Sequence, residues 1–364
     1  MPPVLLAFYR TAGVSRERRY GHEQGGSDAE GFQPTGPPVV GRIVAMNRRE
    51  FLAAGVGLVG ATATAGTLTG AVWPLLTRED LLPGQAPDVE LRPHAWQTAD
   101  DRLSFVALGD NGSGGRQALA VAERMAITYQ TAPYGLVALL GDICYYGNFR
   151  RRFDTVFRRP LGPLIDAGVG FELAIGNHDT ALHFSDHGLS AIEAELELLG
   201  TPGRYYTMSH GPVDFFFLDS SIPGLYGPRA SEQLHWLDDA LASSANQWKV
   251  VALHHPPYSS GQHGSTPGAQ ERLVPVLGRR HVDLVLSGHD HDYERTEPQQ
   301  GVTYVVSGGG CKTTRVGRSA FTAVAERTLQ FLHIEVVGDR LAATCVRADG
   351  SVADRFTLRA REGT

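Results

Sequence analysis

The chain has 364 residues, of which 42% are hydrophobic and 20% are charged, and its formal net charge is -6 at pH 7. This composition is ordinary for a soluble globular protein with a sizeable core. The charge provides no basic field to hold nucleic acid, and no face rich in lysine and arginine stands out, so we expect no nucleic-acid partner.

The N-terminal part of the chain reads as segments that precede the folded domain. Residues 1–45 are rich in Gly, Pro, Arg and Ser, and we expect them to be unstructured or not translated, with translation starting at Met46. In residues 46–76, Arg48 and Arg49 precede a weakly hydrophobic Ala/Gly/Thr/Val run, an order that resembles a twin-arginine export signal. The alternative is an ordinary N-terminal helix that begins with two arginines.

An export signal of this kind implies a protein in the periplasm, at the cell surface or in the medium, with the twin-arginine machinery as a partner. The apolar run is Gly-rich and too weakly hydrophobic to predict a stable membrane span. Ala61, Ala63 and Ala65 offer alternative cleavage sites. Residues 77–102 are polar, contain proline and are expected to form a linker.

The cysteine content limits how the fold is stabilised. Cys144, Cys311 and Cys345 are too few for a disulfide framework, so the fold depends on its hydrophobic core. Two interpretations of Cys311 and Cys345 stay open: a disulfide between them, or two buried free thiols.

Strands and helices alternate through a folded domain that we predict over residues 103–360. Short apolar runs predict strands at 103–109, 136–140, 169–175, 248–254, 282–288 and 302–310. Helical periodicity predicts helices at 115–130, 149–160, 187–199 and 231–244. We expect Pro160 to end the second helix and Ser231 to begin the last. Hairpins are predicted at 204–219 and at 331–347, the second of which closes the chain.

The strand pattern also predicts the fold class. Near-continuous apolar strands separated by helices are typical of strands buried on both faces, and the hairpins indicate antiparallel additions. We therefore predict an α/β fold, a layered sandwich of two mixed β-sheets flanked by helices. Binding residues are expected at the carboxyl ends of the strands, where ligands collect in open α/β folds.

Five strand ends finish in residues that can bind metals. They are GDNG (109–112), GDICYY (141–146), GNHD (176–179), VALHH (251–255) and GHDH (288–291). In four of them a glycine directly precedes the polar residue, which lets the backbone approach a bound ion. His289 and His291 are one residue apart, and in an extended segment both would aim at one spot. Alone, this pair is also explained as two surface histidines, but the five motifs together predict a metal site.

The order GDxG, GDxxY, GNHD, VxxH and GHxH resembles the calcineurin-like metallophosphoesterases, and more narrowly the purple acid phosphatases, over roughly residues 103–345. The segment HHPPYSSGQHG (254–264) is similar to the small tartrate-resistant type. The resemblance implies hydrolysis of a small phosphate ester at two metal ions. The implied ligands are Asp110, Asp142, Tyr145, Asn177, His254, His289 and His291.

A charge argument divides these ligands between two ions that share Asp142. The first ion would have Asp110, Asp142, Tyr145 and His291, and the second Asp142, Asn177, His254 and His289. The anionic first set suits Fe(III), and the largely neutral second set suits Zn(II), Fe(II) or Mn(II). Related phosphodiesterases have a histidine where this chain has Gly112, so Tyr145 must supply the missing donor. Tyr146 is the fallback, and a core tyrosine is the alternative interpretation of Tyr145.

The resemblance also implies a mechanism of the acid phosphatase type. A metal-bound hydroxide attacks phosphorus in line with the departing alkoxide. His178 is the expected general acid, and His263 is a second candidate that can also bind phosphate oxygens. Asp179 would either orient His178 or cap the following turn, and His255 is given no role.

Two other functions compete with this one. A phosphodiesterase or nucleotidase would use the same site, and a non-catalytic protein would keep only the metal-binding residues. Substrate specificity is expected to lie in the loops 180–203, 221–230 and 311–328, whose shape a sequence pattern does not give.

Overall fold

The structure is a computed structural model that describes residues 101–145, 149–181, 196–221 and 228–361. The segments 1–45 and 46–76, which include the predicted export signal, lie outside the described residues, as does most of the linker 77–102. Of the helix predicted at 187–199, only residues 196–199 are described, and they are helical.

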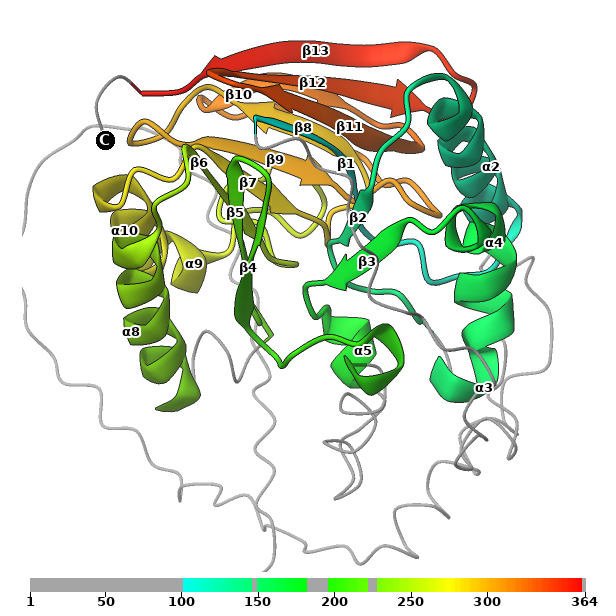
Figure 1. Ribbon diagram of the computed structural model, residues 1–364, viewed down its shortest axis with the longest axis horizontal. Coiled ribbons are helices and arrows are strands. Elements are labelled where there is room, and N and C mark those ends of the chain that lie inside the picture. Colours follow the sequence, from blue (N-terminus) through cyan, green and yellow to red (C-terminus); the bar gives the residue numbers. More distant parts are fainter. Residues whose placement is uncertain (1–100, 146–148, 182–195, 222–227, 362–364) are drawn as a thin grey trace, which may run out of the picture. The chain divides into compact units, whose positions relative to one another are not determined.

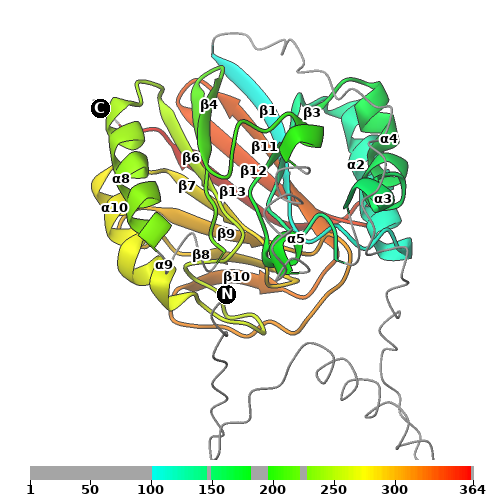
Figure 2. The same cartoon turned by 90° about the horizontal axis from the view of Figure 1, so that it is seen from below.

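Two mixed β-sheets form the centre of the fold (Figures 1 and 2). The first has the order β13-β12-β11-β1-β2-β3, and the second has the order β10-β8-β9-β7-β6-β5-β4. The strands of the first sheet are β1 Arg102–Leu108, β2 Leu136–Leu139, β3 Gly170–Leu173, β11 Gln330–Val337, β12 Arg340–Arg347 and β13 Val352–Arg359. Those of the second are β4 Tyr206–His210, β5 Val213–Phe217, β6 Trp248–Ala252, β7 Leu284–Ser287, β8 Tyr293–Thr296, β9 Thr303–Ser307 and β10 Thr322–Glu326.

Each sheet contains a run of parallel strands, at one end of the first sheet and in the middle of the second. Strands β1, β2 and β3 are parallel, and so are β5, β6, β7 and β9. The remaining pairs are antiparallel, including the predicted hairpin of β4 with β5. The predicted sandwich of two mixed sheets is therefore confirmed.

The central strands are buried on both faces, which explains their continuous apolar sequence. In β1, Phe105 and Ala107 lie between the two sheets, whereas Val106 and Leu108 pack on the outer side against helices. Phe105 meets Phe215 of the second sheet edge to face, with 5.0 Å between the ring centroids. Successive side chains of β1 thus pack into two different cores. A polar residue is therefore unfavourable on either face of the strand.

Helices cover the outer face of each sheet (Figure 2). On the first sheet lie α2 Arg116–Thr131, α3 Phe149–Phe153 and α4 Arg159–Asp166. On the second lie α8 Pro228–Ser243, α9 Pro267–Arg272 and α10 Val274–Arg279. The short helix α5 Asn177–Ala181 follows β3. Among the described residues, no helix has the length and apolar character that crossing a membrane requires.

Three predicted boundaries are wrong. Pro160 does not end its helix, because it lies in the first turn of α4, where a missing N–H is tolerated, directly after the π-helical turn Asp154–Arg158. Helix α8 begins at Pro228, not at Ser231, since proline also suits a first helical position. The hairpin 331–347 does not close the chain, because β13 adds a third strand to it.

The three cysteines form no disulfide with one another. Cys144, Cys311 and Cys345 are buried, and Cys311 and Cys345 pack in different apolar clusters. Of the two interpretations of Cys311 and Cys345 that the sequence left open, the structure therefore agrees with two buried thiols and not with a disulfide between them.

Candidate metal centre

The carboxyl ends of the parallel strands of both sheets meet at one place. The backbone N–H of Gly109, after β1, donates to the carbonyl of Ser307 in β9 at 2.8 Å. The N–H of Gly288, after β7, donates to the carbonyl of His254, after β6, at 3.0 Å. These bonds join the loops in which the sequence motifs lie, so residues far apart in the chain contribute to a single site.

Asp110, Tyr145 and His291 form a first donor group. The Tyr145 hydroxyl donates to Asp110 Oδ1 at 2.9 Å and lies 3.2 Å from His291 Nε2, which is 3.3 Å from Asp110 Oδ1. Two donor atoms about 2.1 Å from one ion, at right angles to each other, lie about 3 Å apart. The three atoms therefore have the spacing of neighbouring ligands on one ion.

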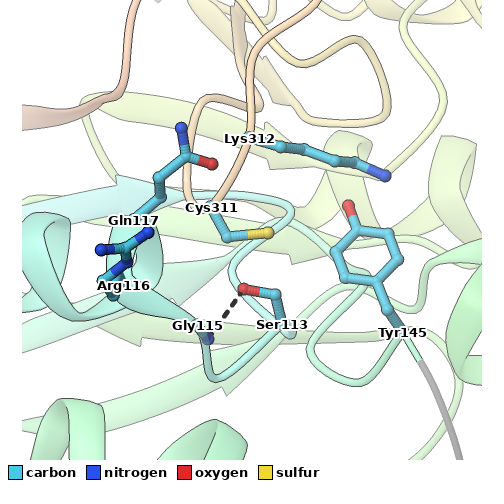
Figure 3. Close-up of a pocket in the computed structure, with 7 residues that line it drawn as sticks. All are labelled: Ser113, Gly115, Arg116, Gln117, Tyr145, Cys311 and Lys312. Carbon is cyan, nitrogen blue, oxygen red and sulfur yellow. Dashed lines mark hydrogen bonds between the residues drawn. The ribbon is translucent and has the colours of Figure 1, made fainter. Parts of the chain in front are cut away.

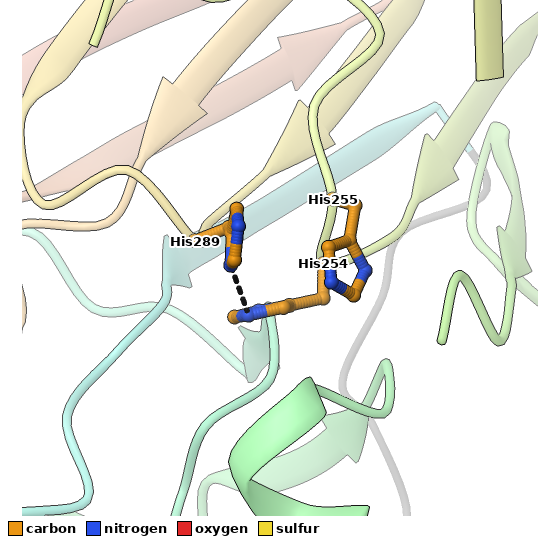
Figure 4. A group of neighbouring side chains, drawn as sticks. All are labelled: His254, His255 and His289. Atoms are coloured by element: carbon orange, nitrogen blue, oxygen red, sulfur yellow. Dashed lines mark hydrogen bonds between the residues drawn. The ribbon is translucent and has the colours of Figure 1, made fainter. Parts of the chain in front are cut away.

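A second donor group surrounds His254. Its Nε2 lies 3.0 Å from Asn177 Oδ1, 3.3 Å from His289 Nδ1 and 3.5 Å from Asp142 Oδ1. Figure 4 shows the ring of His289 turned toward that of His254. His254 Nδ1 faces the carbonyl of Leu140 at 2.7 Å, and a carbonyl only accepts, so Nδ1 carries the hydrogen. In the neutral imidazole, Nε2 is thereby left with its lone pair directed into the group.

Asp142 connects the two groups. Ligand atoms of Asp110, Asp142 and His254 all lie within 4.8 Å of one another. The side chains of Asp110, Asp142 and His254 are almost wholly buried, and charged groups buried together need compensating charge. All the predicted ligands are therefore brought into one cluster, and their donor types and spacing fit a pair of cations.

The cluster shifts the pKa values of its members. Burial opposes ionisation of Asp142, but the adjacent His254 holds the pKa of that carboxyl below its usual range. Burial lowers the pKa of His254, and Asp142 more than reverses this effect and raises it to about 10. Burial, together with the charge of Asp110, raises the pKa of Tyr145. A cation that binds here must therefore displace protons from His254 and Tyr145.

Three of the predicted ligands have a left-handed backbone. The φ angles of Asp110, Asp142 and His289 are 61°, 56° and 72°. This conformation is strained for non-glycine residues, and such strain clusters at functional sites. The segment that contains His289 and His291 is consequently not extended, as the expectation for this pair had assumed. Each histidine belongs to a different donor group.

The glycines of the motifs let neighbouring loops approach each other. A Cβ at Gly176 would lie 2.3 Å from Asp142 Oδ1, and one at Gly141, whose φ is 88°, would lie 2.6 Å from His254 Nδ1. A Cβ at Gly112 would lie 2.3 Å from the backbone of Cys144. The loop that presents Tyr145 therefore occupies the space that a side chain at position 112 would need.

The two catalytic candidates lie beside this cluster. The backbone N–H of His178 donates to Asp142 Oδ1 at 2.8 Å, and its ring centroid is 4.8 Å from that of Tyr145. Burial lowers the pKa of His178. The ring of His263 lies 4.3 Å from that of His289. Its Nδ1 is 3.1 Å from Asp290 Oδ1, and this hydrogen bond raises the pKa of His263.

The role of Asp179 differs from both expected roles, which were to orient His178 or to cap the following turn. It accepts backbone N–H groups from Asp142, Ile143, Cys144 and Gly176, at 2.8, 2.9, 3.3 and 2.8 Å. Its carboxylate therefore holds the loop that carries Asp142 and Tyr145.

Three further residues at the site have no predicted role. Asp290 positions His263. His255 adds a third imidazole to the second donor group, because its ring nitrogen lies within 4.8 Å of ring nitrogens of His254 and His289. Lys312 places its ammonium 4.0 Å above the ring of Tyr145. The adjacent histidines at 254 and 255 were a signal for His255, but nothing in the sequence around Lys312 marks it.

Comparison with known proteins agrees with this geometry. The family model described as calcineurin-like phosphoesterase matches residues 103–293, more than half of the chain. Purple acid phosphatase 7 of Arabidopsis thaliana is 28% identical over 239 residues, which cover 60% of this chain and 73% of that protein. Tartrate-resistant acid phosphatase type 5 of Mus musculus is 28% identical over 334 residues, which cover 80% and 95%.

Two solved structures share the fold. GAP50, described as the anchor in the inner membrane complex of Plasmodium, aligns with a TM-score of 0.62 and 16% identity over 72% of this chain and 90% of its own. The purple acid phosphatase PPD1 of yellow lupin aligns with a TM-score of 0.60 and 21% identity over 71% of this chain and 54% of its own. On the family model and these relatives, the chain belongs to the calcineurin-like phosphoesterases, as a metal-dependent phosphoric ester hydrolase related to the purple and tartrate-resistant acid phosphatases.

Proposed function

We propose that the chain is an exported phosphomonoesterase of the acid phosphatase type, which hydrolyses a small phosphate ester at two metal ions that share Asp142. One observation carries the proposal. The predicted ligands form two donor groups with donor separations from 2.9 to 3.5 Å, and Asp142 lies at the place where the groups meet.

The chemistry of the two groups differs and supports different ions. Asp110, Asp142, Tyr145 and His291 would hold Fe(III), because two carboxylates and a phenolate are hard anionic donors. Asp142, Asn177, His254 and His289 would hold Zn(II), Fe(II) or Mn(II). Metal analysis with a visible spectrum tests this assignment. A broad phenolate-to-iron absorption that is lost in Tyr145→Phe supports Fe(III) at the first group, and its persistence in that variant contradicts a Tyr145 ligand.

When bound, the ions supply a hydroxide nucleophile and positive charge for the phosphoryl group. His178, next to the Asn177 ligand, donates a proton to the departing alkoxide. His263 is held by Asp290 with its ring beside that of His289, where it binds phosphate oxygens.

The test uses metal-loaded protein and two substrates, 4-nitrophenyl phosphate and bis(4-nitrophenyl) phosphate. We expect faster hydrolysis of the monoester, and loss of this activity with retained metal in His178→Ala. Faster hydrolysis of the bis-ester would instead indicate a phosphodiesterase. Hydrolysis of neither substrate, with both ions present, would favour a non-catalytic role, such as the anchor function in the description of GAP50.

The export of the enzyme is part of the proposal and rests on Arg48 and Arg49. Twin-arginine routes move proteins that have already folded, and an enzyme that acquires its ions while folding gains from completing this step before export. The variant with lysine at both positions should leave active enzyme inside the cell. Normal export of that variant would contradict the assignment of the signal.

A further inference from the structure

A cavity of about 360 Å³ lies beside Tyr145 (Figure 3). Its walls come from the loops after β1, β2 and β9 and from the start of α2. The lining residues are Ser113, Gly115, Arg116, Gln117, Tyr145, Cys311 and Lys312. Since the hydroxyl of Tyr145 contacts Asp110 in the first donor group, this cavity borders the metal centre directly.

The cavity is cationic. Among the described residues that line it, Arg116 and Lys312 are the charged ones, and none of these residues is acidic. Among the residues that the structure describes, no carboxylate forms an ion pair with either of them. Two cations that face one cavity, with no carboxylate partner in the described part of the chain, provide a site for an anionic group.

Lys312 connects the cavity to the place where the ester reacts. Its ammonium lies 4.0 Å above the ring of Tyr145. In Figure 3, Lys312 extends toward the hydroxyl of Tyr145, and Arg116 lies at the opposite end of the cavity.

We propose that this cavity binds the leaving group of the substrate, and that Lys312 and Arg116 select leaving groups that carry a second anionic group, either a carboxylate or a further phosphate. The inference rests on the proposed phosphomonoesterase function and names the substrate class of the same site. The scissile phosphate lies at the metal centre, and the second anion extends along the cavity toward Arg116.

The test compares matched substrates that differ in one charge. These are 3- and 4-carboxyphenyl phosphate and the neutral 3- and 4-carbamoylphenyl phosphates, used with wild type, Lys312→Met and Arg116→Met. Each variant should lower kcat/KM for the better carboxylate substrate about five- to ten-fold more than for its carbamoyl counterpart, because a charged hydrogen bond is lost. The matched control is Arg315→Met, an exposed arginine that lines a separate cavity formed by residues 260–262, 313–317 and Arg327.

A binding measurement separates this inference from the proposed function. Calorimetry of the metal-loaded proteins with 4-carboxyphenylphosphonate and phenylphosphonate should show tighter binding of the carboxylate compound to wild type, with the difference lost in Lys312→Met and Arg116→Met. Hydrolysis of all the esters without charge preference, or a selective loss in Arg315→Met alone, would overturn the inference and leave the phosphatase proposal intact. Hydrolysis of none of them would overturn the phosphatase proposal itself.

Discussion

The carboxylate of Asp179 accepts the backbone N–H of Asp142 at 2.8 Å, so one buried aspartate holds another at the centre of the site. The same carboxylate accepts the N–H groups of Ile143 and Cys144, which lead to Tyr145. In Asp179→Asn, an NH₂ group would replace one of the two accepting oxygens and face the N–H groups that this oxygen had bound. We expect about a 10- to 100-fold loss of metal affinity, the range found for residues that support metal ligands.

Competition with a chelator measures this loss, and circular dichroism checks that the variant is folded. Wild-type affinity in a folded Asp179→Asn protein would show that the loop holds its shape without this carboxylate.

The second prediction concerns the close approach of Gly176 to Asp142. A Cβ at position 176 would lie 2.3 Å from both Asp142 N and Asp142 Oδ1, so Gly176→Ala must displace the carboxylate of Asp142. We expect reduced binding of both ions. The control is Gly203→Ala, because a Cβ there would meet nothing closer than 3.8 Å. Metal content after dialysis should fall in the first variant and not in the second, and equal metal content in both would contradict the steric argument.

The sequence predicted the strands, and the residues that the fold brings together at the candidate site could be named in advance, because both depend on local patterns. The apolar runs at 103–109 and 248–254 are long enough to show burial on two faces, and their polar ends mark the edge where the sheets meet. The left-handed backbone of Asp110, Asp142 and His289 was not predictable, since tertiary contacts impose it on residues that do not favour it. Lys312 was missed because its position depends on how the loop after β9 folds back over Tyr145.

A third prediction concerns stability and pH. Burial raises the pKa of Glu172 from 4.5 to about 7, partly offset by the hydrogen bond from the Tyr206 hydroxyl. The folded protein thus binds this proton more tightly than the unfolded chain. Its contribution to the free energy of unfolding is complete below pH 4.5 and is lost as the pH rises through about 7.

Glu172→Gln keeps an acceptor for Tyr206 and removes the titration. We expect it to raise Tm at neutral pH by about 2–4 °C and to change Tm little at acidic pH. Thermal unfolding of both proteins from acidic to neutral pH measures the difference, and parallel Tm-against-pH curves would rule out Glu172 as the titrating group.

The fourth prediction concerns the pair His263 and Asp290. Asp290 accepts both the backbone N–H and the ring Nδ1–H of His263, at 2.7 and 3.1 Å, and thereby sets the direction of the imidazole. Asp290→Asn should weaken inhibition by inorganic phosphate about ten-fold, because the charge-assisted bond that fixes the ring is weakened.

If Asp290 acts through His263, Asp290→Asn should have little further effect in a His263→Ala background. Inhibition constants for inorganic phosphate, measured for wild type, the two single variants and the double variant, form the double-mutant cycle that tests this. Additive losses would show that Asp290 acts on the site by another route.

The central claim is that two ions share Asp142, and metal content per chain tests it most directly. Elemental analysis of the purified wild type should find about two ions per chain, as in two-metal phosphatases. Asp142→Asn should lose both ions together, because both donor groups depend on that carboxylate, whereas Asn177→Ala should lose mainly the ion of the second group. An active wild type with a single ion, or an Asp142→Asn protein that keeps two, would contradict the account.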